Sequence, residues 1–436
     1  MMTLTDVERE VDARIARLHA WLDTMRGPEG YAGPVVHWWR DCLIFCGPAL
    51  DWRYEGIIAG YLTLYERTGN TAWLAQAQRA GDDLLRGQLP DGSYRDSCFE
   101  LNPGPRGTPH EAAADIGLLL LARALRARGD DGWQQYTLAA ERNLRGYYLD
   151  RLWSETEQRF GENVERSSFV PNKSSTLIEA LALLVELTGR EEYAHRYIRP
   201  TADAIVASQV RASGSAVDGA IAQISVGPPR YFPYYQARCV GGLLAARTLL
   251  GDDRYLDAAL AAMRFVLRWR DADGALPQIV YPDGRVNRYP RWIAAVGDVL
   301  RAVDLLRPYG LDADVEPTRC WLLAGQLPGG GFRSADGLAS RVSQRPATGL
   351  PDARDLLPVV GWTDKAFRYL AAQVVEPRAD GVPEWGPPLA ARYEHQAVEF
   401  AEDAQAIQFR RRGRVVYRWR KGDRWAVLRT GTSRAR

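Results

Sequence analysis

The sequence predicts an all-α fold, an (α/α)6 toroid of helical hairpins, with a small C-terminal antiparallel β-meander. Three observations predict it. Glycine-containing turns recur at nearly constant spacing, each turn separates a strongly apolar segment from an amphipathic one, and the helical pattern ends near residue 375. We therefore expect a toroid domain over residues 1–375, followed by a linker and a small basic β appendix over residues 376–436.

The turns set the period of the repeat. Gly69, Gly129, Gly189, Gly251 and Gly310 are separated by 60, 60, 62 and 59 residues. A glycine directly after a helix is typical of a left-handed cap, and a short turn between two helices makes them antiparallel. A fixed period of this kind indicates that each repeat is one hairpin stacked on its neighbours.

The two helices of each hairpin differ in hydrophobicity. The segments before the turns are apolar on most sides, which is typical of buried helices, whereas those after the turns have one apolar face. Six inner helices are therefore expected, within residues 57–64, 112–125, 177–187, 240–250, 293–306 and 362–370. The N-terminal segment, about residues 5–25, is expected to be the outer partner of the sixth and to close the ring.

The loops that follow two outer helices are similar to each other. Residues 88–94 read Gln-Leu-Pro-Asp-Gly-Ser-Tyr, and residues 326–332 read Gln-Leu-Pro-Gly-Gly-Gly-Phe. Hairpins of this length with such loops resemble the six-hairpin glycosidase-like, or α/α toroid, superfamily over roughly residues 5–375. The resemblance implies a carbohydrate-active enzyme, because the superfamily covers glycoside hydrolases, polysaccharide lyases and sugar epimerases, while terpene cyclases use related repeats. An open α-solenoid is the alternative architecture.

Composition narrows the class of protein. Charged residues make up 25% of the chain and the formal net charge is only +2, so no global field favours nucleic acid. The five cysteines are odd in number and scattered, which does not suit a disulfide framework. No Cys and His cluster suits a metal, and neither a metal nor an organic cofactor is expected. Neither a secretory leader nor an apolar run of membrane-spanning length is present, so we expect a cytoplasmic protein.

The long connections from outer to inner helices predict the ligand-binding face. Connections such as 153–173 and 208–234 run to twenty or more residues, whereas the inner-to-outer turns are short. Long ordered loops are usually functional. These lead into helix N-termini, whose unpaired N–H groups favour anionic or strongly polar ligands.

The residues at these junctions are the kinds that bind sugars, with aromatic rings for stacking and polar groups for hydroxyls and carboxylates. The candidate substrate-binding residues are Trp39, Arg53, Glu55, Asn172, Tyr231, Tyr234, Arg238, Arg288, Trp362 and Asp364. The candidate catalytic residues are His110, Glu111, Tyr235 and Asp218. Three of these carboxylates also suit local roles, since Glu111 and Asp364 lie near helix starts and Asp218 belongs to an Asp-Gly turn.

Several chemistries fit this inventory, and we favour hydrolysis of a glycosidic bond of an acidic or polar oligosaccharide or polysaccharide. Hydrolysis needs two carboxyl groups, for which the candidates are Glu55, Glu111, Asp115, Asp218 and Asp364. A polysaccharide lyase fits nearly as well, since Asn172, His110, Tyr235 and Arg238 match the residue kinds of toroid lyases. A uronate epimerase, a non-catalytic glycan-binding scaffold and a terpene-cyclase-like toroid are the further alternatives; the last lacks an Asp-x-Asp-Asp motif here.

The C-terminal appendix is expected to be a basic β-meander. Residues 406–409, 415–419 and 424–429 alternate like short strands, with turns at Arg412-Gly413 and at residues 421–423. Residues 410–436 contain ten arginines and one lysine, with Asp423 as the only acid. Such a patch suits contact with a polyanion, and the alternative is a solvated face offset by the acidic residues 394–403. The sequence does not indicate an oligomeric state.

Overall fold

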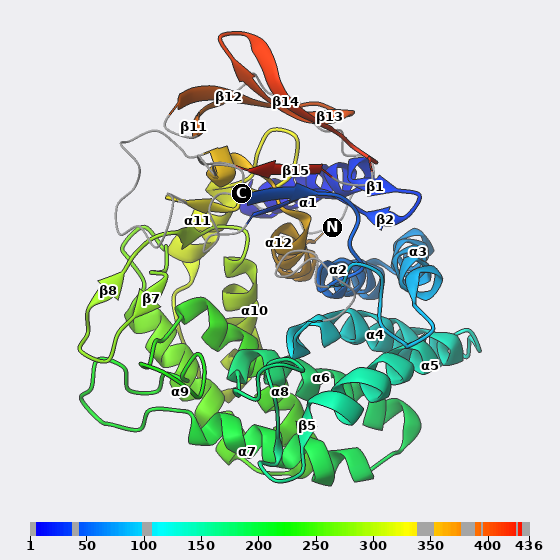
Figure 1. Cartoon of the computed structure of the whole chain (residues 1–436), viewed down its shortest axis with the longest axis vertical. Helices are drawn as coiled ribbons and strands as arrows, with labels where there is room; N and C mark the ends of the chain where they lie inside the picture. Colours follow the sequence, from blue (N-terminus) through cyan, green and yellow to red (C-terminus); the bar gives the residue numbers. More distant parts are fainter. Residues whose placement is uncertain are drawn as a thin grey trace.

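The computed structural model describes residues 6–36, 43–97, 107–337, 353–375, 389–393, 396–423 and 426–429. Within these ranges an inner ring of helices surrounds the centre of the molecule (Figure 1). Its members are α2 (Arg53–Thr68), α4 (Ala113–Ala127), α6 (Pro171–Thr188), α8 (Pro233–Leu250), α10 (Val296–Leu306) and α12 (Val360–Gln373). Each packs on the next and α12 packs on α2, so the ring is closed and the predicted (α/α)6 toroid is confirmed.

Each inner helix has an outer partner. These are α3 (Thr71–Gly87) on α2, α5 (Trp133–Asn143) on α4, α7 (Arg199–Ala207) on α6, α9 (Arg254–Arg268) on α8, and α11 (Glu316–Ala324) on α10. The N-terminal helix α1 (Asp6–Thr24) packs on α12, as expected. Short 3-10 turns cover Pro109–Ala112, Arg307–Tyr309 and Ala353–Leu356, and π-helical segments cover Leu144–Leu152 and Ala194–Ile198.

The five repeat glycines all lie in the left-handed region, in the turns that follow the inner helices. Their φ angles are 67° at Gly69, 72° at Gly129, 71° at Gly189, 67° at Gly251 and 85° at Gly310. This backbone conformation is strained for residues with a side chain, which explains why glycine recurs there.

A repeated glutamine ties successive hairpins together. The side-chain amide of Gln88 donates to Gly92 O (3.0 Å) and to Ala139 O of α5 (2.8 Å). Gln326 does the same with Gly330 O (2.9 Å) and Arg14 O of α1 (2.9 Å). The two similar loops therefore have the same structure, and each one holds the next outer helix.

The long loops contain short pairs of antiparallel strands. They are β1 (Arg26–Gly27) with β2 (Gly30–Tyr31), β5 (Trp153–Ser154) with β6 (Arg159–Phe160), β7 (Ile279–Val280) with β8 (Val286–Asn287), and β9 (Arg291–Trp292) with β10 (Ala335–Asp336). No helix in the described parts of the chain is both long and apolar enough to cross a membrane.

The C-terminal meander is confirmed, with two differences from the expectation. It has four strands, β11 (Leu389–Tyr393), β12 (Gln396–Glu402), β13 (Ala406–Arg411) and β14 (Arg414–Arg420), of which only the last two were predicted. The third predicted strand, β15 (Ala426–Arg429), leaves the meander and pairs with β4 (Leu43–Cys46), which pairs with β3 (Pro34–Val36). The division of the chain near residue 375 stays a prediction.

Candidate functional site

A cavity of about 350 Å³ lies at the N-terminal ends of the inner helices, the face predicted to bind a ligand. We call it the N-end cavity. Aromatic, cationic and amide side chains dominate its lining, which consists of Trp52, His110, Glu162, Val170, Asn172, Lys173, Gln223, Ile224, Arg230, Phe232, Tyr234, Tyr235, Arg238, Trp292, Ala295, Trp362 and Lys365.

Tryptophans and tyrosines form the walls of the N-end cavity. The rings of Trp292 and Trp362 meet edge to face with centroids 4.3 Å apart. Trp52 lies with its ring centroid 5.1 Å from that of His110, and its indole nitrogen donates to Gly361 O (3.0 Å), which fixes the ring. Tyr235 neighbours Tyr234 on the first turn of α8, with ring centroids 5.7 Å apart. Flat rings with fixed orientation suit the faces of sugar rings.

His110 enters the N-end cavity from the 3-10 turn that precedes α4. Its Nδ1 lies 3.3 Å from Thr176 Oγ1, a hydroxyl that also accepts a hydrogen bond from Arg238 Nε (3.0 Å). Burial lowers the pKa of His110 well below its ordinary value, and the cations Arg238 and Lys365 lower it further. The imidazole is therefore neutral at physiological pH.

A buried ion-pair cluster lies beneath the N-end cavity. Glu55 Oε1 accepts from Arg238 Nη1 (2.8 Å) and from Arg368 Nη1 (2.5 Å). Burial alone would raise the pKa of Glu55, but Arg238, Arg368 and Lys365 together hold it well below the ordinary value. The second nitrogen of the Arg238 guanidinium, Nη2, is buried and has no hydrogen-bond partner among the described residues.

Asp364 and Lys365 form a second buried pair in this cluster. Lys365 Nζ donates to Asp364 Oδ2 (2.7 Å), and Lys365 itself reaches the N-end cavity. Burial raises the pKa of Asp364 to about 8, although Lys365 opposes the shift.

The structure brings six of the predicted site residues together in the lining of the N-end cavity. They are His110, Asn172, Tyr234, Tyr235, Arg238 and Trp362. Trp39 lies outside the described residues. Glu55 and Asp364 lie behind the cavity as partners of Arg238 and Lys365.

The other predicted site residues lie elsewhere. Glu111 is buried, with Oε1 accepting from Thr108 N (3.0 Å) and Oε2 from Ser97 Oγ (3.2 Å), and burial raises its pKa to about 7. Arg53 is buried against Asp51. The remaining three are Tyr231, whose backbone bridges to Val280, Asp218, which accepts from Ala212 N (2.9 Å) in its turn, and Arg288, which is exposed and pairs with Asp271.

Two polar residues that line the N-end cavity could not be identified as site residues from the sequence. Glu162 lies in the loop before α6 and pairs with Lys173 Nζ at 3.0 Å, and Gln223 lies in the loop before α8. Neither belongs to a helix, so periodicity could not place them. Trp52, Lys173, Trp292 and Lys365 belong to the polar and aromatic junctions and were identifiable there. Within the described chain no group of His, Cys, Asp or Glu residues could hold a metal ion.

Neither a protein-family model nor a curated protein sequence matches the chain. Solved structures do. Cellobiose 2-epimerase from Bacillus thermoamylovorans is 13% identical with a TM-score of 0.61, over 83% of this chain and 98% of that chain. An unsaturated glucuronyl hydrolase specific for heparin is 14% identical with a TM-score of 0.58, over 84% of this chain and 95% of that chain. A polysaccharide lyase is 13% identical with a TM-score of 0.57, over 84% of this chain and 97% of that chain. The chain has the six-hairpin glycosidase-like fold, and these neighbours are carbohydrate-processing enzymes.

Proposed function

We propose that this chain is a carbohydrate-active enzyme that binds an acidic sugar unit in the N-end cavity and cleaves its glycosidic bond by β-elimination. One observation carries the proposal: Asn172, His110, Tyr235 and Arg238, from three successive hairpins, line the same cavity. Lyase chemistry needs these kinds of side chain, namely a base, a proton donor and groups that neutralise a carboxylate. Polysaccharide lyases and unsaturated glucuronyl hydrolases occur among the structural neighbours.

The substrate carboxylate would bind to Arg238 and Lys365. Arg238 Nη2 and the Asn172 side-chain oxygen are both buried without a hydrogen-bond partner among the described residues. Buried polar atoms of this kind usually have a partner, so their position in a cavity lining supports a polar ligand. A carboxylate on Arg238 Nη2 would satisfy it and draw negative charge away from the carbon to be deprotonated.

His110 would act as the general base. Thr176 Oγ1 has one proton and two lone pairs. When its proton goes to Asn172 O, 3.4 Å away, the oxygen can accept from both Arg238 Nε and His110 Nδ1. That arrangement leaves His110 Nε2 with its lone pair, which can remove a proton from the sugar carbon next to the carboxylate.

Tyr235 would act as the general acid, with Tyr234 beside it. As His110 takes the proton from C5, the C5–H electron pair forms the C4–C5 double bond and the bond from C4 to the leaving oxygen breaks. The leaving oxygen takes the tyrosine hydroxyl proton, and the proton on His110 later returns to the tyrosine. Burial and Asp298 raise the pKa of Tyr234 well above its ordinary value, so this neighbour stays protonated.

Hydrolysis by paired carboxylates is less well supported. Glu162 is the only carboxylate among the described residues that line the N-end cavity, and it pairs with Lys173. Hydrolysis needs two carboxyl groups on opposite sides of the bond. Epimerisation starts with the same proton removal, but the proton would then return to the carbon.

The test is turnover of uronic-acid oligosaccharides. A lyase gives an unsaturated, ultraviolet-absorbing product, a hydrolase gives reducing ends without the chromophore, and an epimerase exchanges the carbon-bound hydrogen with solvent deuterium. We expect the chromophore, with kcat lowered on the order of 100-fold or more in His110→Ala and in Tyr235→Phe. Matched controls are the exposed His195→Ala and Tyr281→Phe, which lies outside the cavity. Reducing ends without chromophore, or full activity in both cavity variants, would refute the proposal.

A further inference from the structure

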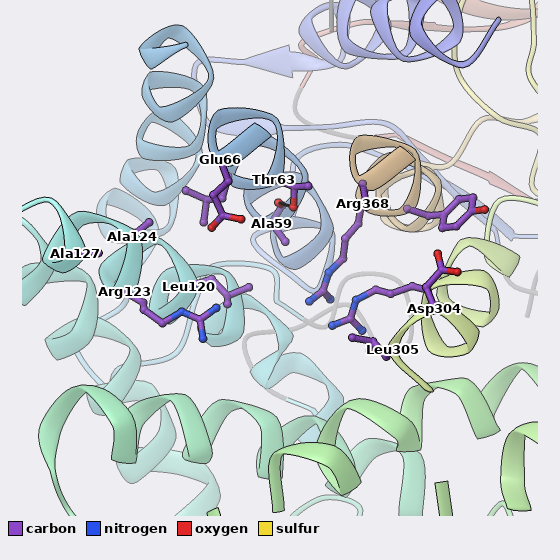
Figure 2. A pocket seen from close by; sticks show the side chains of 14 residues that line it. Ala59, Thr63, Glu66, Leu120, Arg123, Ala124, Ala127, Asp304, Leu305 and Arg368 are labelled. Atoms are coloured by element: carbon purple, nitrogen blue, oxygen red, sulfur yellow. Dashed lines mark hydrogen bonds between the residues drawn. The ribbon is translucent and has the colours of Figure 1, made fainter. Parts of the chain in front are cut away.

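A second cavity, of about 480 Å³, lies at the opposite, C-terminal ends of the inner helices. We call it the C-end cavity. Residues of α2, α4, α10 and α12 line it, and its charged members are Arg123, Arg301, Arg368, Glu66 and Asp304. Figure 2 shows Arg368 extending from α12 toward the middle of this cavity, with Arg123 on the side of α4.

Arg301 and Arg368 lie near the same carboxylate oxygen, but neither of them donates a hydrogen bond to it. Glu179 Oε1 lies 3.6 Å from Arg301 Nη2 and 3.8 Å from Arg368 Nη2, beyond normal hydrogen-bond length. No hydrogen bond from the Arg301 guanidinium is found among the described residues, although its side chain is only 24% exposed. Burial and, after it, the neighbouring Arg368 lower the pKa of Arg301 to about 10, against the opposing effect of Glu179.

Glu55 pairs with Arg368 Nη1 (2.5 Å), but the two acidic residues that line the C-end cavity make no hydrogen bond to Arg301 or Arg368 among the described residues. Asp304 Oδ1 accepts from Arg307 (3.2 Å) and its Oδ2 from Gln373 (3.0 Å), while Glu66 is exposed. Neither Arg301 nor Arg368 belongs to the last turn of its helix, so neither compensates the helix dipole there. Two adjacent guanidinium groups therefore face the C-end cavity with N–H groups that are not used in hydrogen bonds among the described residues.

We propose that the C-end cavity binds a phosphate group between Arg301 and Arg368. Guanidinium forks match phosphate oxygens with paired hydrogen bonds. A phosphate offers more acceptor oxygens and more charge than a carboxylate, which suits two arginines from different helices. The volume of the cavity exceeds what one phosphate needs, so the group is either free phosphate or part of a small metabolite. This inference does not depend on the proposed function.

The experiment is calorimetric titration of the full-length protein with inorganic phosphate, at an ionic strength held constant with chloride. We expect one site per chain, weakened at least tenfold in Arg301→Gln and several-fold in Arg301→Lys, which keeps the charge but loses the fork. The control is Arg145→Gln, an exposed arginine paired with Glu141 on the outer ring. Equal affinity in wild type and Arg301→Gln, or no binding at millimolar phosphate, would overturn the inference.

Two further arms locate the ligand. Excess glucuronate should leave phosphate binding unchanged; displacement by glucuronate together with an unaffected Arg301→Gln would place phosphate in the N-end cavity and overturn the inference. A titration with glucose 6-phosphate in place of inorganic phosphate distinguishes a phosphorylated metabolite from free phosphate as the ligand. Tighter binding that Arg301→Gln weakens indicates a phosphorylated metabolite, and equal or weaker binding indicates free phosphate.

Discussion

His110 has an environment that keeps its imidazole neutral. Its pKa is lowered by burial first and then by Arg238 and Lys365, and a base must be neutral to accept a proton. We therefore expect the His110 ring to titrate well below pH 6.5. Lys365→Gln removes one of these cations and should therefore raise the pKa of His110.

The measurement is a nitrogen-15 NMR titration, in which His110→Ala assigns the signal among the five histidines. On a confirmed substrate, kcat/KM should stay level as pH falls from about 8 to about 6.5, because the base is already deprotonated. A His110 curve unaffected by Lys365→Gln would contradict this account.

Gly56 lies where α2 packs closely against α12. A Cβ at this position would lie 2.3 Å from Asp364 Oδ2 and 2.5 Å from the Asp364 carbonyl oxygen. Helix propensity alone predicts that Gly56→Ala stabilises the protein by up to about 1 kcal/mol. The contact predicts the opposite sign, a loss on the order of 1–3 kcal/mol. Chemical unfolding decides between the two, and an unchanged or higher midpoint would refute the steric argument.

The site residues that could be predicted from the sequence are those at the N-termini of the inner helices. His110, Asn172, Tyr234, Tyr235, Arg238 and Trp362 lie at inner-helix N-termini, and the repeat places those termini on one face. The roles of the carboxylates were harder to predict, because an acidic residue near a helix N-terminus can stabilise the helix as well as bind a ligand. Glu111 hydrogen-bonds within its own turn, and Asp218 does so within its own loop. Glu162 depends on the path of a loop, which local sequence does not specify.

At the scale of elements, the repeated glutamines are expected to stabilise the ring. Gln326→Ala leaves Arg14 O and Gly330 O without this donor, and Gln88→Ala does the same to Ala139 O and Gly92 O. Each substitution should cost about 1–3 kcal/mol. The two sites are far apart in the ring, so their effects should add in the double variant. Thermal unfolding measures this, with the exposed Gln134→Ala as the control.

The elements themselves were largely predictable, because glycine caps and apolar periodicity are local signals. The pairing of strands was not. β15 alternates like a meander strand, yet its partner is β4, more than 370 residues earlier in the chain. No local pattern encodes such a pairing, since it depends on where the closed ring brings the two ends of the chain.

At the scale of the molecule, the β15–β4 pairing joins the two ends of the chain. Its register contains four residue pairs, and at about 0.2–1 kcal/mol for each cross-strand pair it should contribute on the order of 1–4 kcal/mol. A chain ending at Asp423 lacks β15 and should unfold at a lower temperature than a chain ending at Arg429, which retains it. Equal unfolding temperatures would show that the pairing contributes nothing to stability.

The packing of α12 on both α1 and α2 has a consequence for synthesis of the protein. During translation the first five hairpins can stack as each one emerges from the ribosome, but α1 has no inner partner until residue 373 has been made. The apolar face of α1 and the open side of α2 therefore stay uncovered through most of translation. A nascent chain stalled before α12 should bind chaperones through these two surfaces and release them when the sixth inner helix arrives.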